Sequence, residues 1–134
     1  MSVLKYKHMK AKLMDIIPQQ HYLSTDKYNS IKKTLINLDD YGKIYVIEYK
    51  GKIFSIDGHH RLFHLYKNGI TEVEVICELA DNDCKLYQIL ADETIDLGLS
   101  SIADLEYRFI QNYDEYKKKW IDKCQKILEC LQET

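Results

Sequence analysis

The stretch Lys52-Ile53-Phe54-Ser55-Ile56-Asp57-Gly58-His59-His60-Arg61 changes from a strand pattern to a helix pattern. It leads directly into Leu62-Phe63-His64-Leu65-Tyr66, which has helical spacing. A strand that turns sharply into a helix leaves backbone N–H groups free at the helix start, where the helix dipole adds positive charge. Two imidazoles and a guanidinium at the same corner add donors that can match phosphate oxygens. The sequence therefore predicts an anion-binding site at residues 57–61.

Hydrophobic periodicity predicts the elements around this corner. The expected elements are a helix at 25–37, strands at 43–49 and 52–56, a helix at 58–68 and a strand at 71–79. Ser24 is placed to cap the first helix, Lys50-Gly51 is typical of a tight hairpin turn, and Asn68-Gly69 closes the second helix. Residues 1–12 show no clear pattern, and only a short extended segment is predicted before Pro18.

After Ala80 the predicted structure is helical. Residues 85–94 have helical spacing, residues 96–100 form a loop, and Ser101 can cap a further helix. The last helix has an apolar stripe made of Trp120, Ile121, Cys124, Ile127, Leu128 and Leu131. Its opposite face is basic and holds Lys117, Lys118, Lys119, Lys123 and Lys126. We expect the stripe to pack on its own domain and the lysines to be solvated. The alternatives are a homodimer through this helix and a surface for nucleic acid or an acidic partner.

Together these elements predict an α+β fold with a small mixed sheet, flanking helices and a C-terminal helical extension. With 134 residues, we expect a core at 1–80 and an extension at 81–134 that packs on it. A net charge of −2 argues against a broad basic surface for duplex DNA. No run of residues is long and apolar enough for a membrane span. Free thiols and a cytoplasmic location are expected, because no CxxC pair occurs among Cys77, Cys84, Cys124 and Cys130.

A second set of polar residues lies on the helix predicted at 25–37. Lys27, Ser30 and Thr34 stand at i, i+3 and i+7, which places one ammonium and two hydroxyls on one stripe. The apolar stripe of the same helix is Tyr28, Ile31 and Leu35. One face can thus pack while its edge offers donors to a ligand. Taken alone, this spacing favours ordinary solvent-facing residues, and only its combination with the corner at 57–61 makes a ligand site equally favoured.

The residues from Ile56 to Arg61 resemble the signature of the ParB/sulfiredoxin superfamily, and they are closest to the DGHHR of its free-serine-kinase branch. The stretch from Lys27 to Leu35 resembles the sulfiredoxin helix that has Lys, Ser and Thr at this spacing. The resemblance covers about residues 13–79 and implies a domain that binds ATP or ADP. It implies that the phosphates contact Lys27, Ser30, Thr34, Gly58, His60 and Arg61, with Gly58 allowing the backbone to approach them.

The chain departs from these families in three respects. His59 stands where sulfiredoxins have their catalytic cysteine, so repair of a sulfinic acid by their mechanism is not expected. The serine kinases use a glutamate near the start of the first helix, where this chain has Ser24, Thr25 and Asp26. The arginine-rich motif and the helix-turn-helix domain of ParB itself are not seen.

The sequence leaves two functions open. The first is a phosphotransferase that uses ATP or ADP with Mg²⁺ and acts on a small-molecule hydroxyl. In this hypothesis Asp57 holds the metal or accepts the proton, and His59 is a candidate for a phosphoryl intermediate. The second is a non-catalytic nucleotide- or phosphate-binding regulatory module that contacts protein or nucleic acid through the C-terminal helices. Nucleic-acid cleavage is the least favoured reading.

Two other roles of the corner residues stay open at this stage. Asp57 equally fits the N-cap of the following helix. Asp57, His60 and His64 form a weaker candidate set of metal ligands, because the two histidines are four residues apart on a helix.

Overall fold

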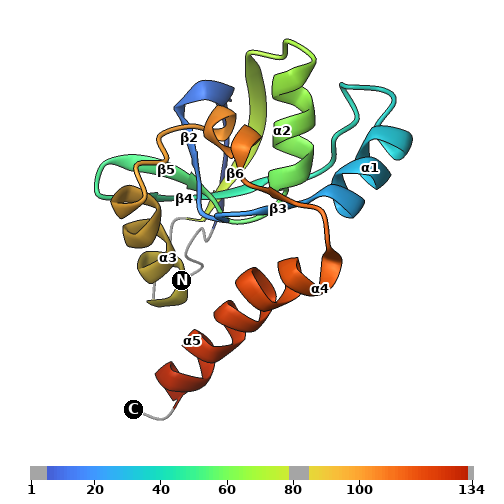
Figure 1. The fold of residues 1–134 in the computed structure, drawn as a ribbon. Coiled ribbons are helices and arrows are strands. Elements are labelled where there is room, and N and C mark those ends of the chain that lie inside the picture. The colour runs from blue at the N-terminus through green and yellow to red at the C-terminus, as the bar shows by residue number, and fades with distance from the viewer. Residues whose placement is uncertain (1–5, 79–84, 133–134) are drawn as a thin grey trace.

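The computed structural model describes residues 6–78 and 85–132. Its centre is a mixed five-stranded sheet with the strand order β1-β6-β4-β5-β2 (Figure 1). The strands are β1 (Tyr6–Lys12), β2 (Ile16–Pro18), β4 (Tyr45–Tyr49), β5 (Lys52–Ser55) and β6 (Glu72–Glu78). Helices flank this sheet and a helical segment follows it, so the predicted α+β class with a small mixed sheet is confirmed.

The strand pairing explains why some strands could be predicted from the sequence and others could not. The β4–β5 hairpin turns at Lys50 and Gly51, whose φ angles of 53° and 74° are those of a type I′ turn, so the predicted hairpin is confirmed. The strand β1, by contrast, was not predicted. It is an edge strand, antiparallel to β6, and Ala11 is its one buried residue. An edge strand that is exposed along almost its whole length needs no hydrophobic alternation, and β1 therefore left no pattern in the sequence.

Two helices lie on one face of the sheet, α1 (Thr25–Thr34) and α2 (His59–Lys67). Ser24 caps α1 as predicted, because its Oγ accepts a hydrogen bond from the Lys27 N–H at 3.2 Å. The helix ends at Thr34, before the predicted residue 37, because Leu35 leaves the helical region with a ψ of 72°. The predicted second helix, 58–68, matches α2 to within one residue at each end.

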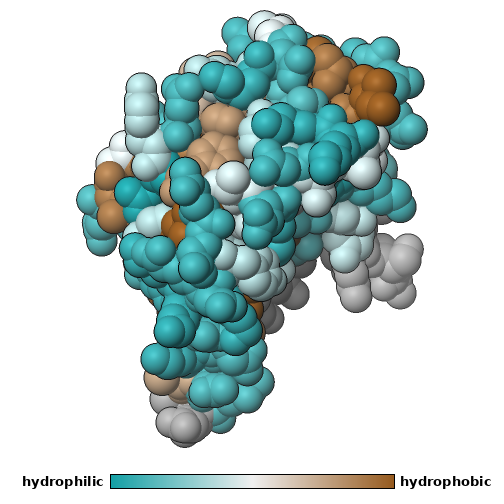
Figure 2. Space-filling model, turned by 45° about the vertical axis from the view of Figure 1, so that its right-hand side comes forward, coloured by the Kyte–Doolittle hydropathy of each residue, from teal (hydrophilic) through white to brown (hydrophobic). Residues whose placement is uncertain are grey.

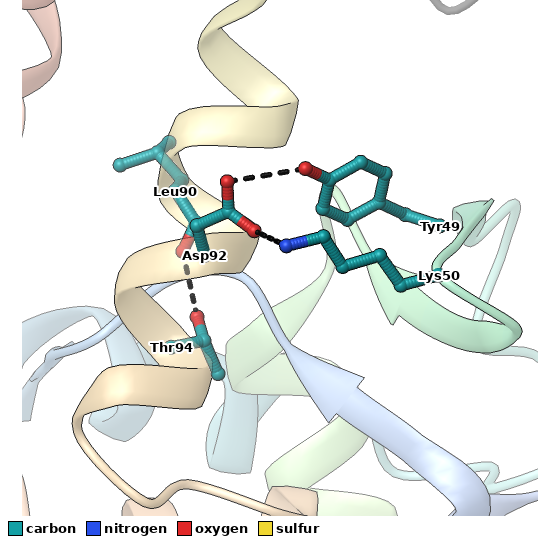
Figure 3. Close-up of polar contacts among 5 residues, drawn as sticks. All are labelled: Tyr49, Lys50, Leu90, Asp92 and Thr94. Atoms are coloured by element: carbon teal, nitrogen blue, oxygen red, sulfur yellow. Dashed lines mark hydrogen bonds and ion pairs between the residues drawn. The ribbon is translucent and has the colours of Figure 1, made fainter.

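A third helix, α3 (Lys85–Asp96), covers the opposite face of the sheet. Neighbouring strand residues point to opposite faces, so Val46 packs in the cluster under α2 while Ile47 packs with Phe54 and Ala91 under α3. Figure 3 shows how α3 is joined to the β4–β5 turn. The Lys50 ammonium lies 2.7 Å from one oxygen of Asp92, and the Tyr49 hydroxyl donates to the other at 3.1 Å. Within α3, the Thr94 hydroxyl donates to the Leu90 carbonyl at 2.9 Å.

The segment after α3 returns to the first helices. Ser101 forms a capping box with Asp104 at the start of η2 (Ile102–Tyr107), which confirms the predicted cap. Two residues of this short helix, Ile102 and Leu105, belong to the hydrophobic cluster under α2. The strand β7 (Phe109–Ile110) then pairs in parallel with β3 (Leu23–Ser24), the two residues that lead into α1. This pairing brings the residues that follow β7 to the start of α1.

The last helical segment extends away from the sheet (Figure 1). It consists of α4 (Tyr113–Tyr116), the π-helical η3 (Lys117–Ile121) and α5 (Asp122–Gln132). The first part of the predicted stripe packs with Leu90 and Tyr116 in a third cluster through Trp120, Ile121, Cys124 and Ile127. On the predicted basic face, Lys117, Lys119 and Lys123 pair with Asp122, Glu115 and Glu93.

The surface is largely polar in the view of Figure 2, with hydrophobic side chains in small separate patches. The most exposed apolar side chains, Ile36 and Tyr107, are 81% and 91% exposed. Free thiols are found at Cys77, Cys124 and Cys130, while Cys84 lies outside the described residues. Among the described helices, none is both long and apolar enough to cross a membrane.

Candidate functional site

A cleft of about 500 Å³ lies between α1 and the start of α2. Three segments form it: the connection before β3, the helix α1, and the corner between β5 and α2. Its lining residues are Gln20, Lys27, Ser30, Ile31, Ile56, Asp57, Gly58, His59, His60 and Arg61. The structure thus brings together two sets of residues that the sequence singled out separately, the corner motif and the polar edge of the first helix.

Gly58 sets the geometry of the corner. It occupies the N-cap position of α2 with a left-handed φ of 70°, and its lack of a side chain leaves room for Arg61. A β carbon at this position would lie 2.9 Å from the Arg61 Nη2 atom. Gly58 has no side chain to cap α2, so the N-cap residue offers no side-chain acceptor to the positive end of the helix dipole.

Asp57 does not have the N-cap role that the sequence left open. Its Oδ1 atom instead accepts a hydrogen bond from the Tyr45 N–H at 2.8 Å, across the corner to β4. Asp57 is the one acidic residue among those that line the cleft. Its second oxygen has no hydrogen-bond donor within the described part of the chain, and it can therefore serve a ligand.

His59 and His60 link the corner to the segment that leads into α1. The Ser24 N–H donates to His60 Nε2 at 2.9 Å, so His60 has its proton on Nδ1. His59 Nε2 lies 3.2 Å from the Gln20 N–H and 3.1 Å from the Ser55 carbonyl oxygen, and its tautomer decides which of the two it bonds. Both Nε2 atoms are therefore engaged by the backbone.

The two imidazoles are also neutral. Burial, followed by the neighbouring His60, lowers the pKa of His59 to about 3. Burial, followed by the positive charge of Lys27, lowers the pKa of His60 to about 4. Two charged imidazoles as phosphate donors, as the sequence suggested, do not fit this corner, because both rings are neutral and the Nε2 atom of each is engaged by the backbone. The geometry also does not suit His59 as a phosphoryl carrier, because its side chain is buried and its Nε2 is engaged.

Lys27 and Arg61 are positioned by neutral groups. Arg61 Nη1 donates to the Tyr41 carbonyl at 2.7 Å, and its guanidinium lies against Gly42 and Gly58. The Lys27 ammonium lies 5.4 Å from the centroid of the Tyr116 ring, in a cation–π contact. Within residues 6–78 and 85–132, neither cation forms an ion pair with a carboxylate. Lys27 and Arg61 therefore line the cleft without an ion-pair partner in the described chain, and Asp57 supplies a negative charge elsewhere in the same lining.

Thr34 is not brought to the other predicted residues. Its side chain is exposed at the last residue of α1, and its hydroxyl donates to the Ser30 carbonyl at 2.9 Å. At 1.5 Å per residue, Thr34 lies roughly 10 Å along the helix axis from Lys27, beyond the end of the cleft.

The structure also corrects the weaker metal set of Asp57, His60 and His64. In the described residues no three side chains of His, Cys, Asp or Glu are arranged to hold a metal ion. His64 is buried and packs edge-on against Tyr28, with a centroid distance of 5.9 Å. It therefore serves the core and not the cleft.

Sequence reasoning missed Gln20 and Tyr116. The Gln20 amide donates to the Tyr116 hydroxyl at 2.6 Å and to the Tyr22 carbonyl at 2.7 Å. Tyr116 is buried, and burial raises its pKa to about 12. Its position is one helical turn before Trp120, so extending the apolar stripe backwards marks Tyr116 as a packing residue but not as a neighbour of the cleft.

No protein-family model matches the chain, and no curated protein matches it significantly. Among solved structures, the chain is similar to protein Atu1540 from Agrobacterium tumefaciens, with 13% sequence identity and a TM-score of 0.47. The match covers 68% of this chain and 50% of the other, so this chain spans about half the length of that protein. A likeness at this level says nothing of function.

Proposed function

We propose that this protein binds the phosphates of ATP or ADP in the cleft and transfers a phosphoryl group to the hydroxyl of a small molecule. The observation that supports this most is the pair of cations, Lys27 and Arg61, which line one cleft without a carboxylate partner in the described residues. Unpaired cations beside an uncapped helix start favour an anion with several charges. The cleft volume of about 500 Å³ is in the range of small-molecule and cofactor sites.

The residues of the cleft have distinct parts in this proposal. Arg61 contacts phosphate oxygens through the N–H groups that the Tyr41 carbonyl leaves free, and Lys27 acts as a mobile point charge. Ser30 adds a hydroxyl from the edge of α1. The ParB/sulfiredoxin resemblance of the corner favours ATP or ADP over other anions.

Asp57 supplies the chemistry of transfer. Its Oδ1 is fixed by the Tyr45 N–H, so its Oδ2 can accept the proton of the substrate hydroxyl. The hydroxyl oxygen then bonds to the terminal phosphorus of ATP, the bond to the ADP oxygen breaks, and the proton remains on Asp57. In the alternative role, Asp57 would hold Mg²⁺ bound with the nucleotide, and the metal would neutralise phosphate charge. Positioning and charge neutralisation account for most of the rate gain in such a site.

A second candidate function is a non-catalytic nucleotide- or phosphate-binding module that contacts protein or nucleic acid through its C-terminal helices. One observation favours it. Where the serine kinases have a glutamate, Ser24 is engaged as the cap of α1 and Asp26 is exposed outside the cleft. Among the described residues that line this cleft, Asp57 is then the one carboxylate.

Nucleotide binding is tested by isothermal titration with ATP, ADP and CTP, with and without Mg²⁺. We expect saturable binding of ATP or ADP that weakens by about tenfold or more in Lys27→Met and in Arg61→Gln, the loss of one charge-assisted contact. Lys67→Met is the matched control, because Lys67 is also a helical lysine but pairs with Glu106 away from the cleft. Wild-type affinity in Arg61→Gln, or no binding at millimolar nucleotide, would contradict the proposal.

Catalysis is tested with Asp57→Asn. The amide oxygen can still accept from the Tyr45 N–H, so the corner is expected to keep its fold. An enzyme should bind ATP as the wild type does and lose about 100-fold or more in turnover, measured as phosphorylation of hydroxyl compounds by ³¹P NMR. A wild-type protein that binds ATP but phosphorylates no compound in such a screen supports the binding module instead.

A further inference from the structure

Tyr116 belongs to the C-terminal extension, yet it contacts three residues that line the cleft. It accepts the hydrogen bond from Gln20, 96 positions earlier in the chain. Its ring lies 5.4 Å from the Lys27 ammonium and 6.3 Å from the His60 ring centroid. The pairing of β7 with β3 brings α4 to this place, since β7 ends just before α4 and β3 leads directly into α1.

The ring of Tyr116 is a fixed platform. Its side chain is 1% exposed and packs in a cluster with Leu90, Ile110 and Trp120. The hydrogen bond from Gln20 fixes its hydroxyl end. Lys27, by contrast, is exposed on the first turn of α1 and would otherwise sample many rotamers.

An aromatic ring is a suitable partner for a cation that has to bind a phosphate. It attracts the ammonium through its quadrupole but has no net charge of its own. A carboxylate in the same place would restrict Lys27 equally well and would neutralise its charge. The ring therefore reduces the freedom that Lys27 loses on binding, and it leaves the full charge for the ligand.

We infer that Tyr116 is a positioning residue that holds Lys27 in place for the nucleotide phosphates, which makes the C-terminal extension part of the nucleotide site. This inference rests on the proposed function of the cleft. It assigns to a segment outside the ParB/sulfiredoxin resemblance a direct part in ligand binding.

The test is a double-mutant cycle on ATP affinity with Tyr116→Leu, Lys27→Met and the double variant. Tyr116→Leu should weaken ATP binding about five- to tenfold in the wild-type background, the scale of a partly desolvated cation–π contact. In the Lys27→Met background the same change should have less than about a twofold effect. Tyr116→Phe keeps the ring and should restore affinity to within about twofold of wild type. An equal loss in both backgrounds, or wild-type affinity in Tyr116→Leu, would overturn the inference.

Trp120→Leu is the control for a general loosening of the cluster. Trp120 is an aromatic member of the same cluster, but its ring contacts His21 and lines no part of the cleft. It should lose stability and keep its ATP affinity at a temperature where circular dichroism shows a folded protein. A loss of affinity equal to that of Tyr116→Leu would show that Tyr116 only supports the core, and the inference would fail.

Two further outcomes separate this inference from the proposed function. If the wild type binds no nucleotide, both fail together. If it binds ATP and Lys27→Met weakens binding while Tyr116→Leu does not, the inference alone fails. Should Tyr116→Leu not fold, the Hε resonance of Lys27 in the wild type gives the answer by NMR. An upfield ring-current shift that Tyr116→Phe retains supports the contact, and a random-coil position overturns it.

Discussion

The cations of the cleft and the lysines of the surface differ in their partners. On the surface, Lys50 pairs with Asp92 at 2.7 Å (Figure 3), and Lys67 pairs with Glu106 at 3.0 Å. In the cleft, Arg61 is held by a carbonyl and Lys27 by an aromatic ring. The two kinds of cation are equally charged, but Lys27 and Arg61 form no ion pair within the described residues, whereas Lys50 and Lys67 do.

The two cleft cations thus differ from Lys50 and Lys67 in the kind of partner and not in charge. A solvated lysine with a carboxylate neighbour satisfies its charge within the chain and contributes little. A cation held by a dipole or a ring is restricted in position and still available to an anion. The net charge of −2 gives no indication of which cations are unpaired, because the formal charge of the chain counts paired and unpaired cations alike.

The largest expected effect is on stability in acid, because buried imidazoles, two of them beside the cations, are kept neutral. Burial, followed in the corner by nearby positive charge, holds the pKa of His59 at about 3 and that of His60 at about 4. Burial likewise lowers the pKa of His21 to about 4. Since the unfolded histidines have a pKa of about 6.5, the unfolded state binds protons first. Stability should be highest above about pH 6.5 and should fall as the pH drops from about 6.5 towards 4.

Urea unfolding at pH 7.5 and at pH 5 measures this fall. Each histidine should remove about 2 kcal/mol over this interval, and the three together about 6 kcal/mol. His60→Gln, whose amide oxygen can accept from the Ser24 N–H, should reduce the fall by about 2 kcal/mol, while His8→Gln in the exposed strand β1 should not change it. Equal stability at the two pH values would show that the imidazoles are not kept neutral.

The second-largest expected effect is a loss of ATP affinity when Lys27 is given a carboxylate partner. Ser30→Glu places a carboxylate one helical turn from Lys27, inside the cleft lining. We expect ATP affinity to fall by about tenfold or more, since the new carboxylate competes with the phosphates and repels them. Ser30→Gln has a similar size without the charge and should lose far less affinity. Equal losses of ATP affinity in the two variants would mean that binding depends on the hydroxyl of Ser30 and not on the unpaired charge of Lys27.

The parts of the fold that local patterns determine were predictable from the sequence. The Ser24 cap, the hairpin at Lys50-Gly51 and the strand-to-helix corner each depend on a few neighbouring residues. The edge strand β1 was not predictable, because its pairing with β6 joins Ala11 to Val73 and its exposed side chains have no periodicity. The position of β1 depends on contacts with residues that are distant in the sequence.

The candidate site shows the same division. Helical spacing predicted that Lys27 and Ser30 share one stripe, and the ParB/sulfiredoxin resemblance implied that Arg61 lies with them; the three residues line one cleft. What the sequence could not show is which atoms already have partners. Backbone groups engage the Nε2 atoms of the two corner histidines, and the non-local β3–β7 pairing brings Tyr116 to the cleft.

A smaller effect is expected from two glycines that share a left-handed conformation. Gly58 and Gly51 have φ angles of 70° and 74°, but a β carbon would meet Arg61 only at Gly58 and nothing within 4 Å at Gly51. Alanine at either position should cost about 1 kcal/mol of stability from backbone strain. Only Gly58→Ala should also weaken ATP binding, by about three- to fivefold, because Arg61 has to shift. Equal ATP affinity in the two variants would indicate that the position of Arg61 against Gly58 is not critical.

The smallest effect is expected from breaking a surface pair. Glu106→Gln frees the Lys67 ammonium, which lies at the C-terminal end of α2, where the helix dipole favours a cation. The urea midpoint should therefore be unchanged within error, and ATP affinity should match that of the wild type. A second measurement uses the double variant Glu106→Gln/Arg61→Gln. Compared with the wild type, this double variant has lost a cation of the cleft and has gained an unpaired cation on the surface. This variant should bind ATP no better than Arg61→Gln alone, because Lys67 is exposed and lines no part of the cleft. Recovery of binding would show that an unpaired charge is sufficient by itself, and that the walls of the cleft contribute nothing to recognition.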